Sequence, residues 1–129
     1  MGKASPLPMP VAAALVAIAR SSEFEQCGFI LDGWGIRPMV NWAYEPRRNF
    51  KFMYTEQHDV VDSGANIIGI YHTHPGGTSR PSQNDIEGWP MVNGEGCRYW
   101  IATSEALSEW AKDKDGKVTF VGGTIPVFN

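Results

Sequence analysis

The sequence predicts an α/β or α+β fold, because helical and strand patterns are interspersed along the chain. Three observations support this prediction: an apolar, alanine-rich segment near the start, several short apolar runs between turn residues, and a hairpin signal near the end. The 129 residues suit one domain, and a hydrophobic content of 43% suffices for a core. We therefore expect residues 1–129 to form a single compact domain.

Proline, glycine and Asp-Gly pairs divide the chain into its expected elements. Pro10 suits the first turn of a helix over 11–20. Asp32-Gly33 and Asp115-Gly116 are turn signals, and each lies between two apolar runs. The expected strands are 27–31, 36–44, 49–53, 66–74, 98–103, 107–112 and 117–121. A further helix is expected after Thr55-x-x-His58, through Val60, Val61 and Ala65 and closed near Gly64, and another from residue 83 to a stop at 88 or 90.

Charge and cysteine content exclude several classes of protein. The net charge is −3 and the pI about 5.5, without a basic cluster, so nucleic acid is not an expected partner. The apolar stretch 11–19 is too short to cross a bilayer, so we expect a cytoplasmic protein with no membrane partner. Cys27 and Cys97 are too few for a secreted disulfide framework and do not form a Cys-x-x-Cys zinc pair.

Two histidines close the isoleucine-rich strand expected over 66–74. Residues two apart on a strand project from the same face, so His72 and His74 would point the same way, together with Ile68 and Ile70. Buried histidines at that place need hydrogen-bond partners or a metal. Taken alone, the pair is more typical of two satisfied or surface histidines.

Ser82 and Asp85 open the helix expected after the loop Pro75–Pro81. A serine followed three residues later by an acid resembles a capping box, which is the structural interpretation. Alternatively, Asp85 supplies an anionic third ligand beside the two imidazoles. Two histidines and one carboxylate leave a fourth position for water, as a catalytic zinc site requires.

The motif as a whole resembles a known signature. His72-x-His74-Pro75, followed at fixed spacing by Ser82 and Asp85, is similar to the signature of the JAMM (MPN+, Mov34/PAD-like) zinc metalloproteases. The resemblance implies a mixed sheet flanked by helices and a zinc ion (Zn2+) held by His72, His74 and Asp85.

The resemblance also implies the catalytic groups. In this family a glutamate on an early strand is the general base, and Glu25, just ahead of Cys27-Gly28, matches it; Glu23 is the less suitable neighbour. Glu25 would take the proton of the attacking water and deliver it to the leaving amine. Ser82 would donate to the developing oxyanion.

The expected function follows from this family. The chain would be a short prokaryotic or phage-type peptidase or isopeptidase, cutting an amide bond at the C-terminal tail of a ubiquitin-like or sulfur-carrier protein. Two alternatives stay open: a phage tail-assembly or cell-wall peptide endopeptidase, and a non-catalytic MPN-type platform that binds proteins and would not need Glu25. A zinc deaminase is excluded, because the chain has neither His-x-Glu nor Cys-x-x-Cys. Trp89, four residues after Asp85, is a candidate wall of the substrate cleft.

Overall fold

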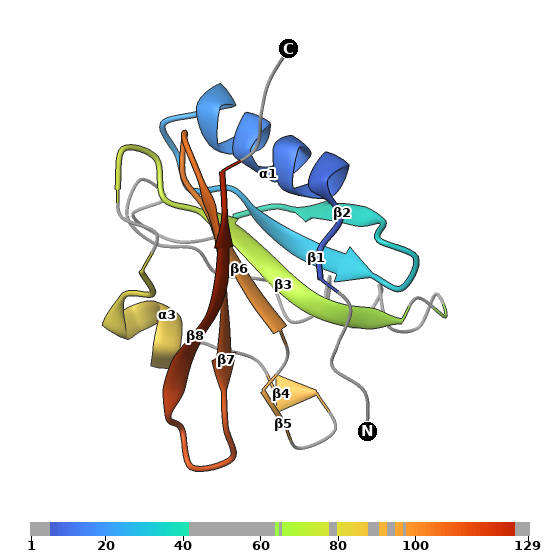
Figure 1. The fold of residues 1–129 in the computed structure, drawn as a ribbon, viewed down its shortest axis with the longest axis vertical. Coiled ribbons are helices and arrows are strands. Elements are labelled where there is room, and N and C mark those ends of the chain that lie inside the picture. Colours follow the sequence, from blue (N-terminus) through green and yellow to red (C-terminus); the bar gives the residue numbers. More distant parts are fainter. Residues whose placement is uncertain are drawn as a thin grey trace.

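A six-stranded mixed sheet forms the centre of the protein (Figure 1). The computed structural model describes residues 6–41, 64, 66–77, 80–87, 91–92, 95–96 and 98–125. Its elements are α1 (Met9–Ser21), β1 (Cys27–Leu31), β2 (Ile36–Met39), β3 (Ile67–Thr73), α3 (Gln83–Glu87), β4 (Met91–Val92), β5 (Glu95–Gly96), β6 (Arg98–Ala102), β7 (Leu107–Lys112) and β8 (Val118–Thr124). The strand order is β2-β1-β3-β6-β7-β8; β3 and β6 run parallel and the other neighbours antiparallel. This mixed sheet with helices confirms the predicted fold class.

Most expected elements have nearly the predicted bounds, and the differences have physical reasons. The strand predicted over 36–44 ends at Met39. The last strand continues to Thr124, because its pairing with β7 extends to Leu107. The sequence did not predict β4 and β5, since two-residue strands carry no periodicity. Outside the described residues lie the predicted strand 49–53, almost all of the helix expected after Thr55, and Trp89.

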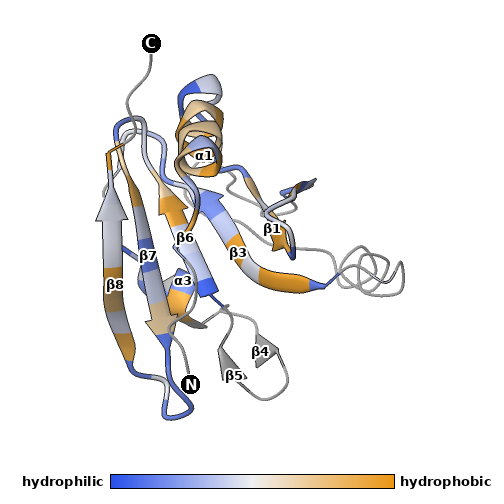
Figure 2. Ribbon diagram, turned by 45° about the vertical axis from the view of Figure 1, so that its right-hand side comes forward, coloured by the Kyte–Doolittle hydropathy of each residue, from blue (hydrophilic) through white to orange (hydrophobic). Residues whose placement is uncertain are grey.

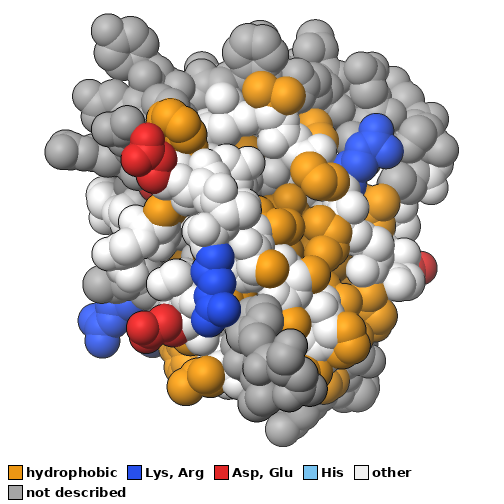
Figure 3. Space-filling model, turned by 90° about the horizontal axis from the view of Figure 1, so that it is seen from above, with side chains coloured by type: hydrophobic (Ala, Val, Ile, Leu, Met, Phe, Trp, Pro, Cys, Tyr) orange, Lys and Arg blue, Asp and Glu red, His pale blue; other side chains and the backbone are white. Residues whose placement is uncertain are grey.

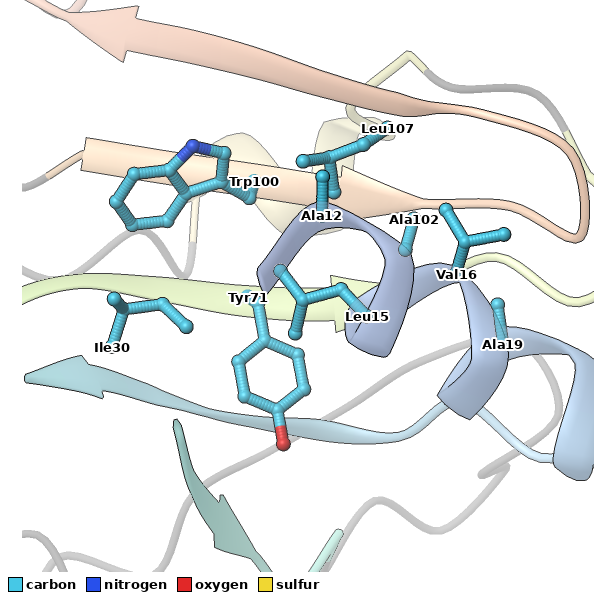
Figure 4. Close-up of a cluster of buried hydrophobic side chains, with 9 residues drawn as sticks. All are labelled: Ala12, Leu15, Val16, Ala19, Ile30, Tyr71, Trp100, Ala102 and Leu107. Atoms are coloured by element: carbon cyan, nitrogen blue, oxygen red, sulfur yellow. The ribbon is translucent and has the colours of Figure 1, made fainter. Parts of the chain in front are cut away.

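One face of the sheet is covered by α1. Its buried residues recur at the spacing of one helical face. These are Ala12, Leu15, Val16 and Ala19. Pro10 lies in the first turn, where its missing N–H costs no helical hydrogen bond. The helix packs on side chains from four strands, in a cluster made of Ala12, Leu15, Val16, Ala19, Ile30, Tyr71, Trp100, Ala102 and Leu107 (Figure 4).

A second cluster lies on the opposite face and consists of Phe29, Ile70, Tyr99 and Ile101. The prediction that Ile68 shares this face with Ile70 is wrong, because Ile68 packs against the α1 cluster. The pairing of β1 with β3 shifts at this point: Ile30 pairs with Gly69, whereas Leu31 pairs with Ile67. This bulge inserts one extra residue into β3. The side chains that precede it along β3 therefore face the side of the sheet opposite to the one that simple alternation predicts.

The outer surface around α1 is largely apolar. Arg20 is the only charged residue of this helix, and Met9 at its start is 52% exposed. Seen from the α1 end of the molecule, hydrophobic side chains gather in the middle of the surface and the lysine and arginine side chains on it are scattered (Figure 3). Among the described residues, no helix is long and apolar enough to span a membrane.

A glycine is required at position 28, because atoms of the neighbouring strands β2 and β3 lie close to its Cα. A Cβ at this position would clash with the carbonyl oxygen of Arg37 and with the ring of Tyr71. We expect Gly28→Ala to lower the free energy of unfolding by about 1–3 kcal/mol, as overpacking does in cores. Chemical denaturation measures this loss. Gly35→Ala is the matched control, because its nearest neighbour would be 3.8 Å away, and it should change stability little.

Candidate metal centre

Two carboxylate and two imidazole side chains converge beside the start of β1 and the end of β3. Glu25, His72, His74 and Asp85 each offer a ligand atom, and these atoms all lie within 4.8 Å of one another. The Nε2 atoms of His72 and His74 are 2.7 Å apart, and Oδ2 of Asp85 lies 3.2 Å and 3.1 Å from them. The structure therefore brings together four of the five residues singled out from the sequence, with Ser82 adjacent to Asp85.

The strand β3 presents both histidines on one side. His72 is fully buried, and its ring meets that of Tyr99 edge to face at 5.2 Å. His74 lies one residue beyond β3, where its N–H donates to the carbonyl of Ala102 at 2.9 Å and continues the ladder with β6. Along β3 the colour changes from hydrophobic to hydrophilic toward this end (Figure 2). The same face thus changes from apolar core to polar site within one strand.

Asp85 acts as a cap and also joins the cluster. The Ser82 N–H donates to Oδ2 of Asp85 at 2.7 Å, and the Asp85 N–H donates to Oγ of Ser82 at 3.1 Å. This reciprocal pair is the capping box that the spacing suggested. The same Oδ2 also faces both histidines, so the two interpretations of Asp85 are compatible. Oγ of Ser82 accepts in the cap, which leaves its O–H free to donate elsewhere.

Glu25 is held in place through its backbone. The Gln26 N–H donates to Oγ1 of Thr73 at 2.8 Å, and the Thr73 N–H donates to the Gln26 carbonyl at 2.9 Å. Nδ2 of Asn41 donates to the carbonyl of Glu25 at 2.9 Å. The side chain of Glu25 is consequently directed into the cluster and is only 4% exposed, whereas Glu23 is exposed and outside it.

Burial and hydrogen bonding set the protonation of these groups. Burial raises the pKa of Glu25 to about 7, against the lowering effect of His74. Burial lowers the pKa of His72 to about 4, although Asp85 raises it, so this imidazole is neutral near pH 7. Burial alone would raise the pKa of Asp85, but hydrogen bonds from His72, His74 and the Ser82 N–H outweigh it and hold that pKa well below its usual range. A neutral imidazole and an ionised carboxylate are the forms that bind a metal.

The donor set fits a zinc ion. Around tetrahedral zinc, with bonds of about 2.0–2.1 Å, neighbouring ligand atoms are about 3.3 Å apart. The separations of 2.7–3.2 Å among the His72, His74 and Asp85 atoms therefore require shifts of only a few tenths of an ångström. Oε1 of Glu25 is buried without a hydrogen-bond partner among the described residues, 3.7 Å from Nε2 of His72. Buried carboxylates are costly unless paired or bound to a cation.

Sequence reasoning missed the residues that hold this site in position. Thr73 and Asn41 anchor the Glu25 segment, and Nζ of Lys112 donates to the carbonyl of Ile86 at 2.8 Å, tying α3 to β7. A threonine between two histidines carries a weak signal for its role, because its side chain projects to the other side of the strand. Asn41 and Lys112 carry no signal that a single sequence reveals.

Known proteins resemble this chain in sequence and in fold. A Desampylase from Pyrococcus furiosus is 24% identical over 127 residues, covering 89% of this chain and 86% of that protein. The solution structure of a protein from Desulfitobacterium hafniense matches with a TM-score of 0.63 at 24% identity, covering 84% of each chain, and thus shares the fold. The model of the family described as prokaryotic homologs of the JAB domain matches residues 8–114. The resemblance to the JAMM/MPN proteins is thereby confirmed, and the chain belongs to the prokaryotic homologs of the JAB domain.

Proposed function

We propose that this protein is a zinc-dependent peptidase or isopeptidase that hydrolyses an amide bond at the C-terminal tail of a ubiquitin-like or sulfur-carrier protein. The observation that carries the proposal is the convergence of Glu25, His72, His74 and Asp85 within 4.8 Å. A platform that only binds proteins has no use for a buried carboxylate beside two histidines and an aspartate, because its burial costs free energy.

In the proposed site His72, His74 and Asp85 hold the metal. Zinc bound there supplies Lewis-acid polarisation of the scissile carbonyl and activates water at neutral pH. Oε1 of Glu25 lies 3.7 Å from Nε2 of His72, so this carboxylate is beside the atoms that would hold the metal and can reach a water bound there. Glu25 accepts the proton of the attacking water and passes it to the leaving amine. Ser82 donates its O–H toward the oxygen on which negative charge develops.

The substrate class rests on the relatives and on the openness of the site. The relative from Pyrococcus furiosus is named Desampylase, the name of an enzyme that removes a protein modifier. His72 is fully buried, whereas the side chain of His74 is 12% exposed, so a tail can approach from the His74 side. We place the enzyme in the cytoplasm, because its two cysteines are too few for the disulfide framework of a small secreted protein.

A cleavage screen tests the proposal. The zinc-loaded chain is incubated with fusions in which ubiquitin-like tails are joined through an amide or isopeptide bond to a reporter. We expect cleavage at the end of the tail, loss of cleavage with a chelator and recovery when zinc is returned. Cleavage of cell-wall peptides alone would favour the endopeptidase alternative, and no cleavage by the zinc-bound chain would favour the binding platform.

Ser82 distinguishes a purely structural cap from a catalytic donor. If Ser82 also donates to the oxyanion, Ser82→Ala should lower kcat by about 10²–10³-fold and leave zinc content unchanged. Loss of the cap alone should cost about 1 kcal/mol of stability. Turnover and denaturation of the same variant separate the two effects. An unchanged kcat would restrict Ser82 to its role as the cap.

A further inference from the structure

A hollow of about 530 Å³ lies directly beside Glu25. The segment that leads into β1 and the end of β2 line it. β2 lies at one edge of the sheet that the described strands form (Figure 1). Phe24 and Val40 on its rim are 41% and 54% exposed. Nδ2 of Asn41, also in its lining, holds the carbonyl of Glu25 at 2.9 Å, so the hollow and the candidate base share one wall. We call this hollow the β2 groove.

One lining residue of the β2 groove, Met39, lies on the same face of the sheet as the histidines. Met39 pairs with Cys27 on β1, and Cys27 pairs in turn with His72 on β3. Side chains of directly paired residues project from the same face, so these three form one row across the sheet. Two strand spacings separate Met39 from His72, which is about 10 Å. An extended peptide covers that distance in about three residues.

The chemistry of the groove suits an apolar side chain. Among the seven described residues that line it, four are apolar, namely Met39, Val40, Phe24 and Pro38, and Glu25 is the only charged one. Pro38 removes one backbone donor from the edge strand β2, so recognition through strand addition is weakened at this edge. The groove therefore offers burial of apolar surface and little backbone pairing.

We propose that the β2 groove is a specificity subsite that takes an uncharged aliphatic or aromatic side chain of the substrate, within about three residues of the scissile amide. The proposal rests on the metal centre proposed above, since the position of the scissile bond is fixed by it. An anionic side chain at that substrate position is disfavoured, because the described lining offers it no cation and holds the carboxylate of Glu25.

Alkyl hydroxamates test the groove without a known substrate. Acetohydroxamate and octanohydroxamate carry the same metal-binding group, and the longer one adds an alkyl chain that can reach from the metal to Met39. We expect the zinc-loaded chain to bind octanohydroxamate roughly tenfold or more tightly than acetohydroxamate, measured by calorimetry. Val40→Asp and Met39→Ala should reduce this ratio and leave the affinity for acetohydroxamate unchanged.

A matched control lies at the other edge of the sheet. Val121 on β8 is 56% exposed, close to the 54% of Val40, so Val121→Asp makes the same chemical change far from the groove and should keep the full ratio. Equal affinities for the two compounds, or a ratio that survives both groove variants, would overturn the subsite. If acetohydroxamate itself fails to bind, the metal centre fails, and the subsite that rests on it fails too.

Discussion

Glu25→Gln is expected to retain zinc and the fold while losing hydrolysis by about 10²–10⁴-fold, the usual contribution of a general base. Glutamine keeps the shape of the side chain and can accept the same hydrogen bonds, but it cannot take up the proton of the attacking water. The backbone contacts that position residue 25, to Asn41 and through Gln26 to Thr73, do not involve the carboxylate. The variant should therefore bind substrate as the parent does, and the loss of hydrolysis should appear as a lower kcat.

Glu23→Gln is the control for this experiment. Glu23 is two residues away and exposed, and it lies outside the cluster, so its replacement should leave kcat unchanged. Zinc content and turnover are measured on both variants. Loss of zinc from Glu25→Gln would make Glu25 a metal ligand, and full activity of this variant would assign the base to another residue.

His74→Ala should lower the zinc content from about one ion per chain to nearly none, and hydrolysis should be lost with it. Removing one of three ligands leaves one carboxylate and one imidazole, fewer than the three protein ligands of a catalytic zinc site. His74 is the more suitable histidine for this test, because its side chain is 12% exposed, whereas His72 is part of the core. The same loss is expected for His72→Ala, with a larger cost in stability.

Stability with and without zinc provides an independent measure of this effect. At a zinc concentration 100 times the Kd, binding should stabilise the parent by about 2.7 kcal/mol, and His74→Ala should show almost none of this gain. His58, the remaining histidine of the chain, lies outside the described residues. His58→Ala should respond to zinc like the parent. A His74→Ala variant with an undiminished zinc content would contradict the ligand assignment.

The sequence predicted the parts of this protein that depend on local pattern. The helix over 11–20, the strand 27–31 and the strand that carries the histidines follow from apolar periodicity and turn residues, and they lie where predicted. The grouping of His72, His74 and Asp85 was predicted from spacing, because a strand places the histidines on one side and the following helix returns Asp85 to them. Their roles as metal ligands, and those of Glu25 and Ser82 in catalysis, stay predictions.

The remaining features depend on contacts between distant segments. The bulge that turns Ile68 to the α1 face arises from the register between β1 and β3, which the sequence of β3 alone does not contain. Asn41 bonds to Glu25 from 16 positions away along the chain, and Thr73 bonds to the neighbouring Gln26 from 47 positions away. The early end of β2 and the short strands β4 and β5 likewise reflect pairing geometry more than residue preference.

X-ray absorption at the zinc edge of the zinc-loaded protein tests the central claim most directly, because it measures the atoms bound to the ion. The proposed site predicts only nitrogen and oxygen ligands at about 2.0–2.2 Å, including two imidazoles. Cys27 pairs with His72 across β1 and β3 and is buried, so its thiol is the nearby alternative ligand among the described residues. A zinc–sulfur distance of about 2.3 Å, or a spectrum without imidazole scattering, would contradict the assignment of His72, His74 and Asp85.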